Sequence, residues 1–170
     1  MKMTKLLLGV ACLGMVALTA SADESAKLAV DGEELTIRAK APAHAENLDE
    51  VSSGWIYRSK ETQAMQLDDF DNPAFVFVDK AIDQWDKVDG SEGKACSSCH
   101  ENVEDFAGLR TTLPRVEDGK LVSMENLVNE CRTERMGADA WKWSKGKMTS
   151  MTALIGVQSR GMPIDVAIDG

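Results

Sequence analysis

The sequence predicts a mostly α-helical domain preceded by an extended N-terminal arm. Three segments repeat apolar residues at the spacing of an amphipathic helix, and start or stop signals flank each of them. The chain before the first of these segments is polar and alternates only weakly. A chain of 170 residues is long enough to bury one core, so we expect a single ordinary domain.

Residues 1–22 have the three parts of a secretory signal peptide. Two lysines precede an apolar run from Leu6 to Leu18, and Ala20-Ser21-Ala22 offers small residues for cleavage. The run of about 13 residues is shorter than the roughly 20 that cross a bilayer, which disfavours a membrane anchor. We expect cleavage after Ala22, loss of Cys12 with the leader, and a periplasmic mature chain.

An extended arm or a short strand is expected over residues 23–53, which are rich in Ala and Glu, contain Pro42 and alternate weakly at residues 34–38. The first helix should begin with Asn72 as cap and Pro73 as first residue, because both residue types favour these positions. Its apolar positions are Ala74, Phe75, Val78, Ala81, Ile82 and Trp85, and Gly90 and Gly93 follow it.

Two further helices are expected after a loop that spans residues 101–120 and contains an Asp118-Gly119 turn. Ser123 is the natural cap of the second helix, and its apolar face directs the thiol of Cys131 inward. The third helix runs from about Gly146 to Ser159, before Gly161 and Pro163.

Cys96-Ser97-Ser98-Cys99-His100 lies between the first helix and the loop. The pattern Cys-x-x-Cys-His is the attachment signature of c-type haem, in which two thiols bond one porphyrin and the histidine binds its iron. The sequence therefore predicts a cytochrome c-like domain over residues 54–170. We expect it to carry one haem c on Cys96 and Cys99, with His100 as an axial ligand.

Two other uses of this motif fit less well. A redox-active dithiol leaves His100 without a role, and the sequence lacks the βαβ pattern of such proteins. A zinc site would need two more ligands, which only Cys131 and His44 offer.

The residues leave the second axial ligand open. Methionine is a common choice in c-type cytochromes, but Cys131 is a lone thiol in an oxidising compartment once Cys96 and Cys99 hold the haem. A buried cysteine is equally a small apolar residue, and His44, water or an open position are further alternatives. The candidate methionines are Met124, Met136, Met148, Met151 and Met162.

Two arginines follow Cys131 closely. Arg132 and Arg135 either act on the haem, by pairing with its propionates or tuning the Cys131 thiolate, or form a solvated helix face.

The formal net charge of −9 bears on partners. A strongly acidic chain is a poor ligand for nucleic acid and for anionic membranes, and we expect neither as a partner. A basic face of another protein is the complementary partner.

Several segments together resemble the SoxA family, the larger cytochrome subunit of the thiosulfate-oxidising Sox system. The resemblance covers roughly residues 53–170. It rests on Gly54-Trp55-Ile56-Tyr57-Arg58-Ser59, Asp71-Asn72-Pro73, the haem motif, Cys131-Arg132-Thr133-Glu134-Arg135-Met136-Gly137 and Gln158-Ser159-Arg160-Gly161-Met162-Pro163-Ile164.

The resemblance implies a subunit of an L-cysteine S-thiosulfotransferase, paired with a SoxX-type monohaem cytochrome. Such complexes join thiosulfate oxidatively to a cysteine of the SoxYZ carrier and pass electrons to soluble cytochrome c. It also implies that Cys131 is the second axial ligand of the iron. A thiolate ligand would favour the ferric state and lower the reduction potential.

The family pattern continues into a second cytochrome-like half with a second haem and the catalytic cysteine. This sequence holds no second Cys-x-x-Cys-His motif, so none of its residues is expected to be catalytic. We expect the chain to carry the N-terminal, non-catalytic haem. The alternatives are a stand-alone electron-transfer cytochrome with His/Met ligation and a haem-bearing interaction module.

Overall fold

The structure is a computed structural model that describes residues 27–30 and 32–167. The expected signal peptide, residues 1–22, lies outside the described residues.

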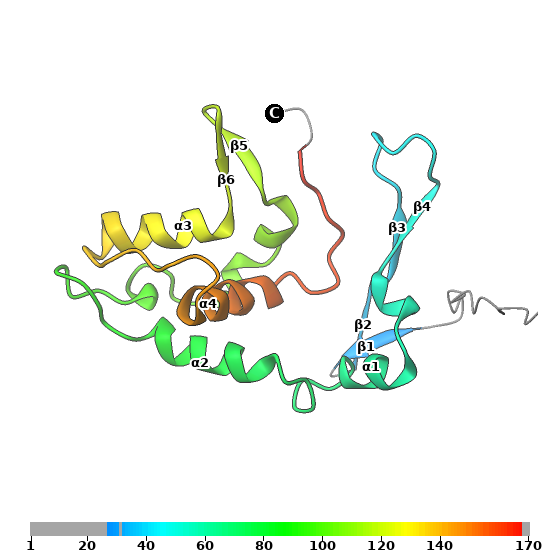
Figure 1. The fold of residues 1–170 in the computed structure, drawn as a ribbon, viewed down its shortest axis with the longest axis horizontal. Coiled ribbons are helices and arrows are strands. Elements are labelled where there is room, and N and C mark those ends of the chain that lie inside the picture. The colour runs from blue at the N-terminus through cyan, green and yellow to red at the C-terminus, as the bar shows by residue number, and fades with distance from the viewer. Residues whose placement is uncertain (1–26, 31, 168–170) are drawn as a thin grey trace, which may run out of the picture.

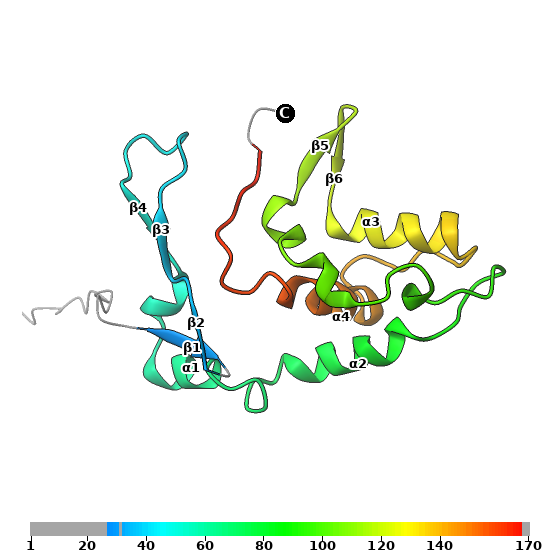
Figure 2. The ribbon, with the colours of Figure 1, turned by 180° about the vertical axis from the view of Figure 1, so that it is seen from behind.

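Three helices form the body of the molecule (Figures 1 and 2). They are α2 (Phe75–Trp85), α3 (Met124–Glu130) and α4 (Gly146–Val157), and α4 packs against both of the others. The central position of α4 explains its burial, which includes Met148, Met151, Leu154 and Ile155. The prediction of a mostly α, cytochrome c-like domain is thereby borne out in its helices.

The three helices occur where the apolar spacing predicts them, but α2 begins later than expected. The Asn72 side chain accepts a hydrogen bond from the Ala74 N–H at 3.1 Å, and the Asn72 carbonyl accepts one from the Phe75 N–H at 3.0 Å. These bonds close a turn around Pro73, so regular helix starts only at Phe75.

The N-terminal part of the molecule contains two antiparallel hairpins rather than a plain extended arm. β1 (Leu28–Val30) pairs with β2 (Glu33–Leu35), and β3 (Arg38–Lys40) pairs with β4 (Glu50–Ser52). A short helix that the sequence analysis did not anticipate, α1 (Lys60–Met65), follows these hairpins and lies beside β1 and β2 (Figures 1 and 2). The Ser59 side chain caps it by accepting from the Thr62 N–H at 3.3 Å.

The segment expected as a loop is more ordered than predicted. It contains 3₁₀ turns at Val103–Phe106 and Leu109–Thr112, followed by a hairpin of β5 (Arg115–Glu117) and β6 (Lys120–Val122). The predicted Asp118-Gly119 turn connects the two strands, and both residues have the positive φ that a tight hairpin turn requires.

Candidate haem site

An apolar cavity of about 540 Å³ lies among the three helices and the loop after the Cys-x-x-Cys-His motif. This volume falls in the range of small-molecule and cofactor sites. Trp85 of α2 and Met151 of α4 contribute to its wall, together with Leu127 and Val128 of α3 and Phe106 of the loop.

The haem-attachment motif forms a tight 3₁₀ turn, Cys96–Ser98, at the edge of this cavity. The N–H groups of Cys99 and His100 both donate to the Cys96 carbonyl, at 3.1 and 3.0 Å. The Ser98 hydroxyl accepts from the Ala95 N–H at 2.9 Å. These local bonds fix the direction in which the motif side chains leave the backbone.

Two of the three predicted motif residues face the cavity. Cys96 and His100 line it, whereas Cys99 is exposed and lies outside the lining. The His100 ring lies 4.9 Å from the Phe106 ring and 6.3 Å from the Trp85 ring, measured between centroids. The imidazole therefore packs in one cluster with two aromatic side chains at the cavity wall, because the Trp85 and Phe106 rings are also neighbours, at 6.0 Å between centroids.

Cys131 reaches the same cavity from a separate element. It follows α3 directly and opens a π-helical turn, Cys131–Arg135, in which the Met136 N–H donates to the Cys131 carbonyl at 3.2 Å. Such wider turns are often found at functional sites. The predicted inward direction of the Cys131 thiol agrees with this position.

Charge on the Cys131 thiol would act on Cys96, and charge on the Cys99 thiol would act on Cys131. Burial raises the pKa of Cys96, and the nearby Cys131 raises it further. Burial likewise raises the pKa of Cys131, with a second contribution from Cys99. Without a cation these thiols keep their protons, whereas a bound metal ion deprotonates a coordinating thiol.

The structure narrows the candidates for the second axial ligand. Met124 and Met151 line the cavity with Cys131, whereas Met136, Met148 and Met162 are not among its lining residues. His44 lies between β3 and β4 and does not line the cavity either. The zinc alternative, which needed His44 beside Cys131, loses that ligand for the same reason.

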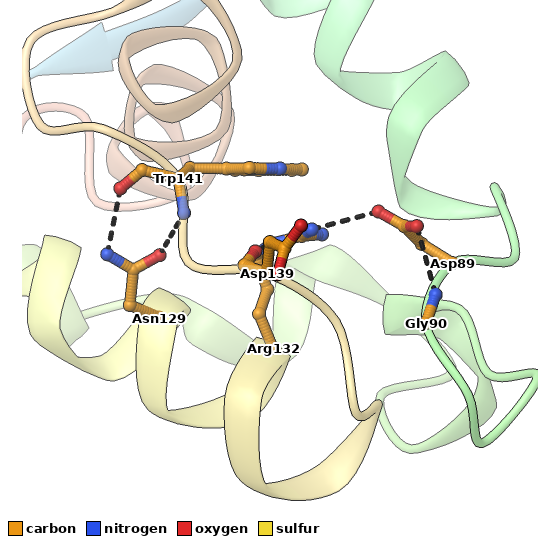
Figure 3. A network of polar contacts seen from close by, with 6 residues as sticks. All are labelled: Asp89, Gly90, Asn129, Arg132, Asp139 and Trp141. Atoms are coloured by element: carbon orange, nitrogen blue, oxygen red, sulfur yellow. Dashed lines mark hydrogen bonds and ion pairs between the residues drawn. The ribbon is translucent and has the colours of Figure 1, made fainter.

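Arg132 is buried at the cavity wall, which excludes the solvated helix face that its sequence position allowed. The residue is only 4% exposed, and Figure 3 shows its side chain between two anchors. The Nη2 atom donates to Asp89 Oδ2 at 2.8 Å, and Nε donates to the Asp139 carbonyl at 3.0 Å. Arg135, by contrast, is exposed.

Trp141 completes this wall, and the sequence analysis did not assign it a role. Its ring lies under the Arg132 guanidinium, at 4.0 Å from the centroid. The Asn129 side chain holds its backbone from both sides, accepting from the Trp141 N–H at 2.8 Å and donating to its carbonyl at 3.0 Å (Figure 3). The only feature of the sequence that pointed to Trp141 was that a tryptophan stands in a polar segment between two predicted helices.

The residues fit a haem. The cavity is apolar and large enough for a cofactor, and a histidine nitrogen and a cysteine sulfur reach it from different elements. The motif at its edge supplies the two thiols that covalent attachment needs. Together these features define a c-type cytochrome domain.

Comparisons with known proteins identify its family. The family model for the SoxA/TsdA cytochrome c domain matches residues 80–164, and such a domain implies haem c as its cofactor. The chain belongs to the SoxA family.

Two relatives and one solved structure illustrate the match. The L-cysteine S-thiosulfotransferase subunit SoxA of Rhodovulum sulfidophilum is 47% identical over 155 residues, which are 88% of this chain and 54% of the relative. The subunit of the same name from Paracoccus pantotrophus is 46% identical over 140 residues, covering 81% of this chain and 48% of the relative.

A chain in the crystal structure of SoxXA from P. pantotrophus superposes with a TM-score of 0.77 at 42% identity. The match covers 88% of this chain and 59% of the other. The chain thus spans about half the length of the curated relatives it matches.

Proposed function

We propose that this chain is the SoxA-type haem subunit of an L-cysteine S-thiosulfotransferase and carries the N-terminal, non-catalytic haem c of that enzyme. The relatives from R. sulfidophilum and P. pantotrophus carry this enzyme name, which supports the assignment. The observation on which it rests in this molecule is a single apolar cavity lined by both His100 and Cys131.

Cys96 and Cys99 would hold one haem c by thioether bonds, and His100 and Cys131 would bind its iron. The haem supplies an iron that takes up and releases one electron. Cys131 would stabilise the ferric state, because a thiolate donates negative charge to the metal. Phe106 and Trp85 restrict the orientation of the His100 ring, and the apolar wall excludes water.

A haem with this ligation has a low reduction potential, which suits it poorly to the main electron path. The catalytic cysteine and a second haem belong to a further half of the family pattern. For the haem on Cys96 and Cys99 we therefore propose a role in structure and assembly.

The complete complex joins this subunit to a SoxX-type monohaem cytochrome in the periplasm, after cleavage following residue 22. The likeness to a chain of the P. pantotrophus SoxXA crystal structure supports the pairing. In the reaction, a sulfur–sulfur bond forms between thiosulfate and a SoxYZ cysteine thiol, which releases one proton and two electrons. Soluble cytochrome c accepts the electrons, and the net charge of −9 favours a basic surface on such an acceptor.

Electron paramagnetic resonance of the oxidised, haem-loaded protein tests the ligation. We expect a low-spin His/thiolate signal that Cys131→Ala abolishes and that Met124→Leu and Met151→Leu retain. The two leucine variants are matched controls, because they alter the same cavity wall without removing the thiol.

The competing function is a stand-alone electron-transfer cytochrome with His/Met ligation, which the position of Met124 and Met151 at the cavity favours. It predicts the opposite pattern, in which one leucine variant loses the low-spin signal and Cys131→Ala keeps it. That result would remove the assignment of Cys131.

Assembly is tested by making the full chain together with a SoxX-type cytochrome and purifying through a tag on one of them. Recovery of both haem proteins in one peak supports the proposed complex. Recovery of the tagged protein alone contradicts it.

A further inference from the structure

We infer that Arg132 is a positioning residue that holds the Cys131 sulfur at the haem iron. The inference rests on the proposed function, because it takes Cys131 to be an axial ligand. Arg132 does not need to touch the haem for this role. It acts through the turn that it shares with Cys131.

Arg132 fastens the turn through both its side chain and its backbone. The carbonyl of Arg132 accepts from the Ala138 N–H at 2.9 Å, while its side chain donates to Asp89 and to the Asp139 carbonyl. The preceding carbonyl, that of Cys131, accepts from the Met136 N–H at 3.2 Å. The residue next to the ligand is thus fixed on three sides.

Asp89 connects this turn to the haem-attachment motif. Asp89, which holds the guanidinium, also donates its backbone N–H to the Lys94 carbonyl at 2.9 Å, two residues before Cys96. The Arg132–Asp89 ion pair therefore ties the element that carries Cys131 to the element that carries Cys96 and His100 (Figure 3). This pair is one of the contacts that hold the two walls of the cavity together.

The contacts of the Arg132 side chain require arginine. The planar guanidinium donates from Nε and Nη2 to two different acceptors and stacks on the Trp141 ring at 4.0 Å. A lysine has the same charge but no fork and no flat face, so it cannot make the three contacts together. If Arg132 acted on the Cys131 thiolate only through its positive charge, a lysine at this position would preserve the effect.

Arg135 provides the matched control. It lies in the same π-helical turn and its positive charge acts on Cys131 as that of Arg132 does, but it is exposed. Removing its charge tests long-range electrostatics without altering the contacts of Arg132.

The experiment compares haem-loaded wild type, Arg132→Lys, Asp89→Asn and Arg135→Gln by electron paramagnetic resonance and by the reduction potential of the haem. We expect Arg132→Lys to lower the ratio of thiolate-ligated to unligated iron about 10-fold, as loss of an outer-shell partner of a metal ligand does. The potential should rise with that loss. Arg135→Gln should keep the wild-type spectrum.

Asp89→Asn decides the question if Arg132→Lys does not fold, because it weakens the ion pair from its exposed end. Partial loss of the thiolate signal in either variant supports the inference. Unchanged spectra in the folded variants, or an equal change in Arg135→Gln, overturn it. A wild type without a thiolate signal would instead reject the ligation proposed for Cys131, and the inference with it.

Discussion

The carboxylate of Asp89, which is half exposed, forms an ion pair with the buried guanidinium of Arg132. It accepts from Arg132 at 2.8 Å and from the Gly90 N–H at 2.9 Å, while its side chain remains half exposed. The hydrogen bond from Arg132, followed by that from the Gly90 N–H, holds the pKa of Asp89 below its usual value of 3.8. The Asp89 carboxylate is therefore more stable in the folded than in the unfolded chain.

This difference between the pKa of Asp89 in the folded and the unfolded chain predicts how the free energy of unfolding depends on pH. A carboxyl group with a lowered pKa in the folded state stabilises it above the unfolded pKa, and the contribution disappears as the pH falls through the folded pKa. We expect haem-loaded wild type to be more stable than Asp89→Asn at about pH 6. The difference should decline below about pH 4.

Denaturant unfolding of both haem-loaded proteins at a series of pH values measures this difference, and titrations common to both proteins cancel in it. A stability difference that stays constant down to the acid limit would show that Asp89 does not act as an ionised partner of Arg132.

Outside the haem-attachment motif, Cys131 is the site residue whose position was most predictable from the sequence. Its place in the apolar repeat of a helix capped by Ser123 determines an inward direction, and the structure has that capped helix. Trp141 was not predictable, because its position depends on Asn129, twelve residues away, and on the stacking of Arg132. Neither contact produces a periodic pattern in the sequence.

Among the elements, the segment before the haem motif and the end of the π-helical turn approach unusually closely. The N–H groups of Ser91 and Glu92 donate to the carbonyls of Gly137 and Met136, both at 3.1 Å. A Cβ atom at Gly90 would lie 2.2 Å from the Met136 carbonyl oxygen, and Gly90 has a φ of +75°. This glycine is therefore required by backbone contact as well as by conformation.

Gly90→Ala should destabilise the protein by more than about 3 kcal/mol, because steric overlap with rigid backbone adds to the cost of a left-handed conformation. Gly93→Ala is the matched control. Gly93 has a φ of +59° in the same segment, but nothing lies within 4 Å of its Cβ position. We expect it to cost only about 1 kcal/mol, the conformational part alone.

Thermal or denaturant unfolding of the haem-loaded variants measures the two losses. Equal losses in Gly90→Ala and Gly93→Ala would mean that the contact with the Met136 carbonyl adds nothing.

α2 was predictable because it carries a periodic apolar face, and it ends at Trp85 as the pattern indicates. α4 was predictable from its content of apolar residues and from Gly161 and Pro163 after it. The hairpin of β5 and β6 was missed although its Asp118-Gly119 turn was recognised. Its strands have only three residues each, too few to show alternation, and Val116 and Leu121 pair across it on an exposed face. Local turn chemistry formed this hairpin without a buried face to mark it.

At the scale of the whole molecule, the cavity is assembled from segments far apart in the chain. The motif and Cys131 were recognised by residue type, but Trp85, Phe106 and Ile155 line the same cavity only because α2, the loop and α4 converge. Convergence of this kind depends on helix packing, which the sequence of any one segment does not contain.

None of the described helices is long and apolar enough to cross a membrane.

This architecture makes the fold dependent on its cofactor. When no haem fills it, the apolar cavity of about 540 Å³ leaves the side chains of its wall without packing partners and in contact with water. A chain without haem must therefore collapse around the cavity or lose its fixed packing.

The double variant Cys96→Ser/Cys99→Ser removes both attachment points and tests this dependence. We expect much of the far-ultraviolet helical circular dichroism to remain, because α2 and α4 still bury apolar faces. The near-ultraviolet signal of Trp85 and Trp141 at the cavity wall should be lost, and the unfolding transition should become broad. The single variant Cys99→Ser, which keeps the cavity-lining Cys96, should retain haem and a cooperative transition. A double variant with native near-ultraviolet dichroism and sharp unfolding would show that helix packing alone maintains the cavity.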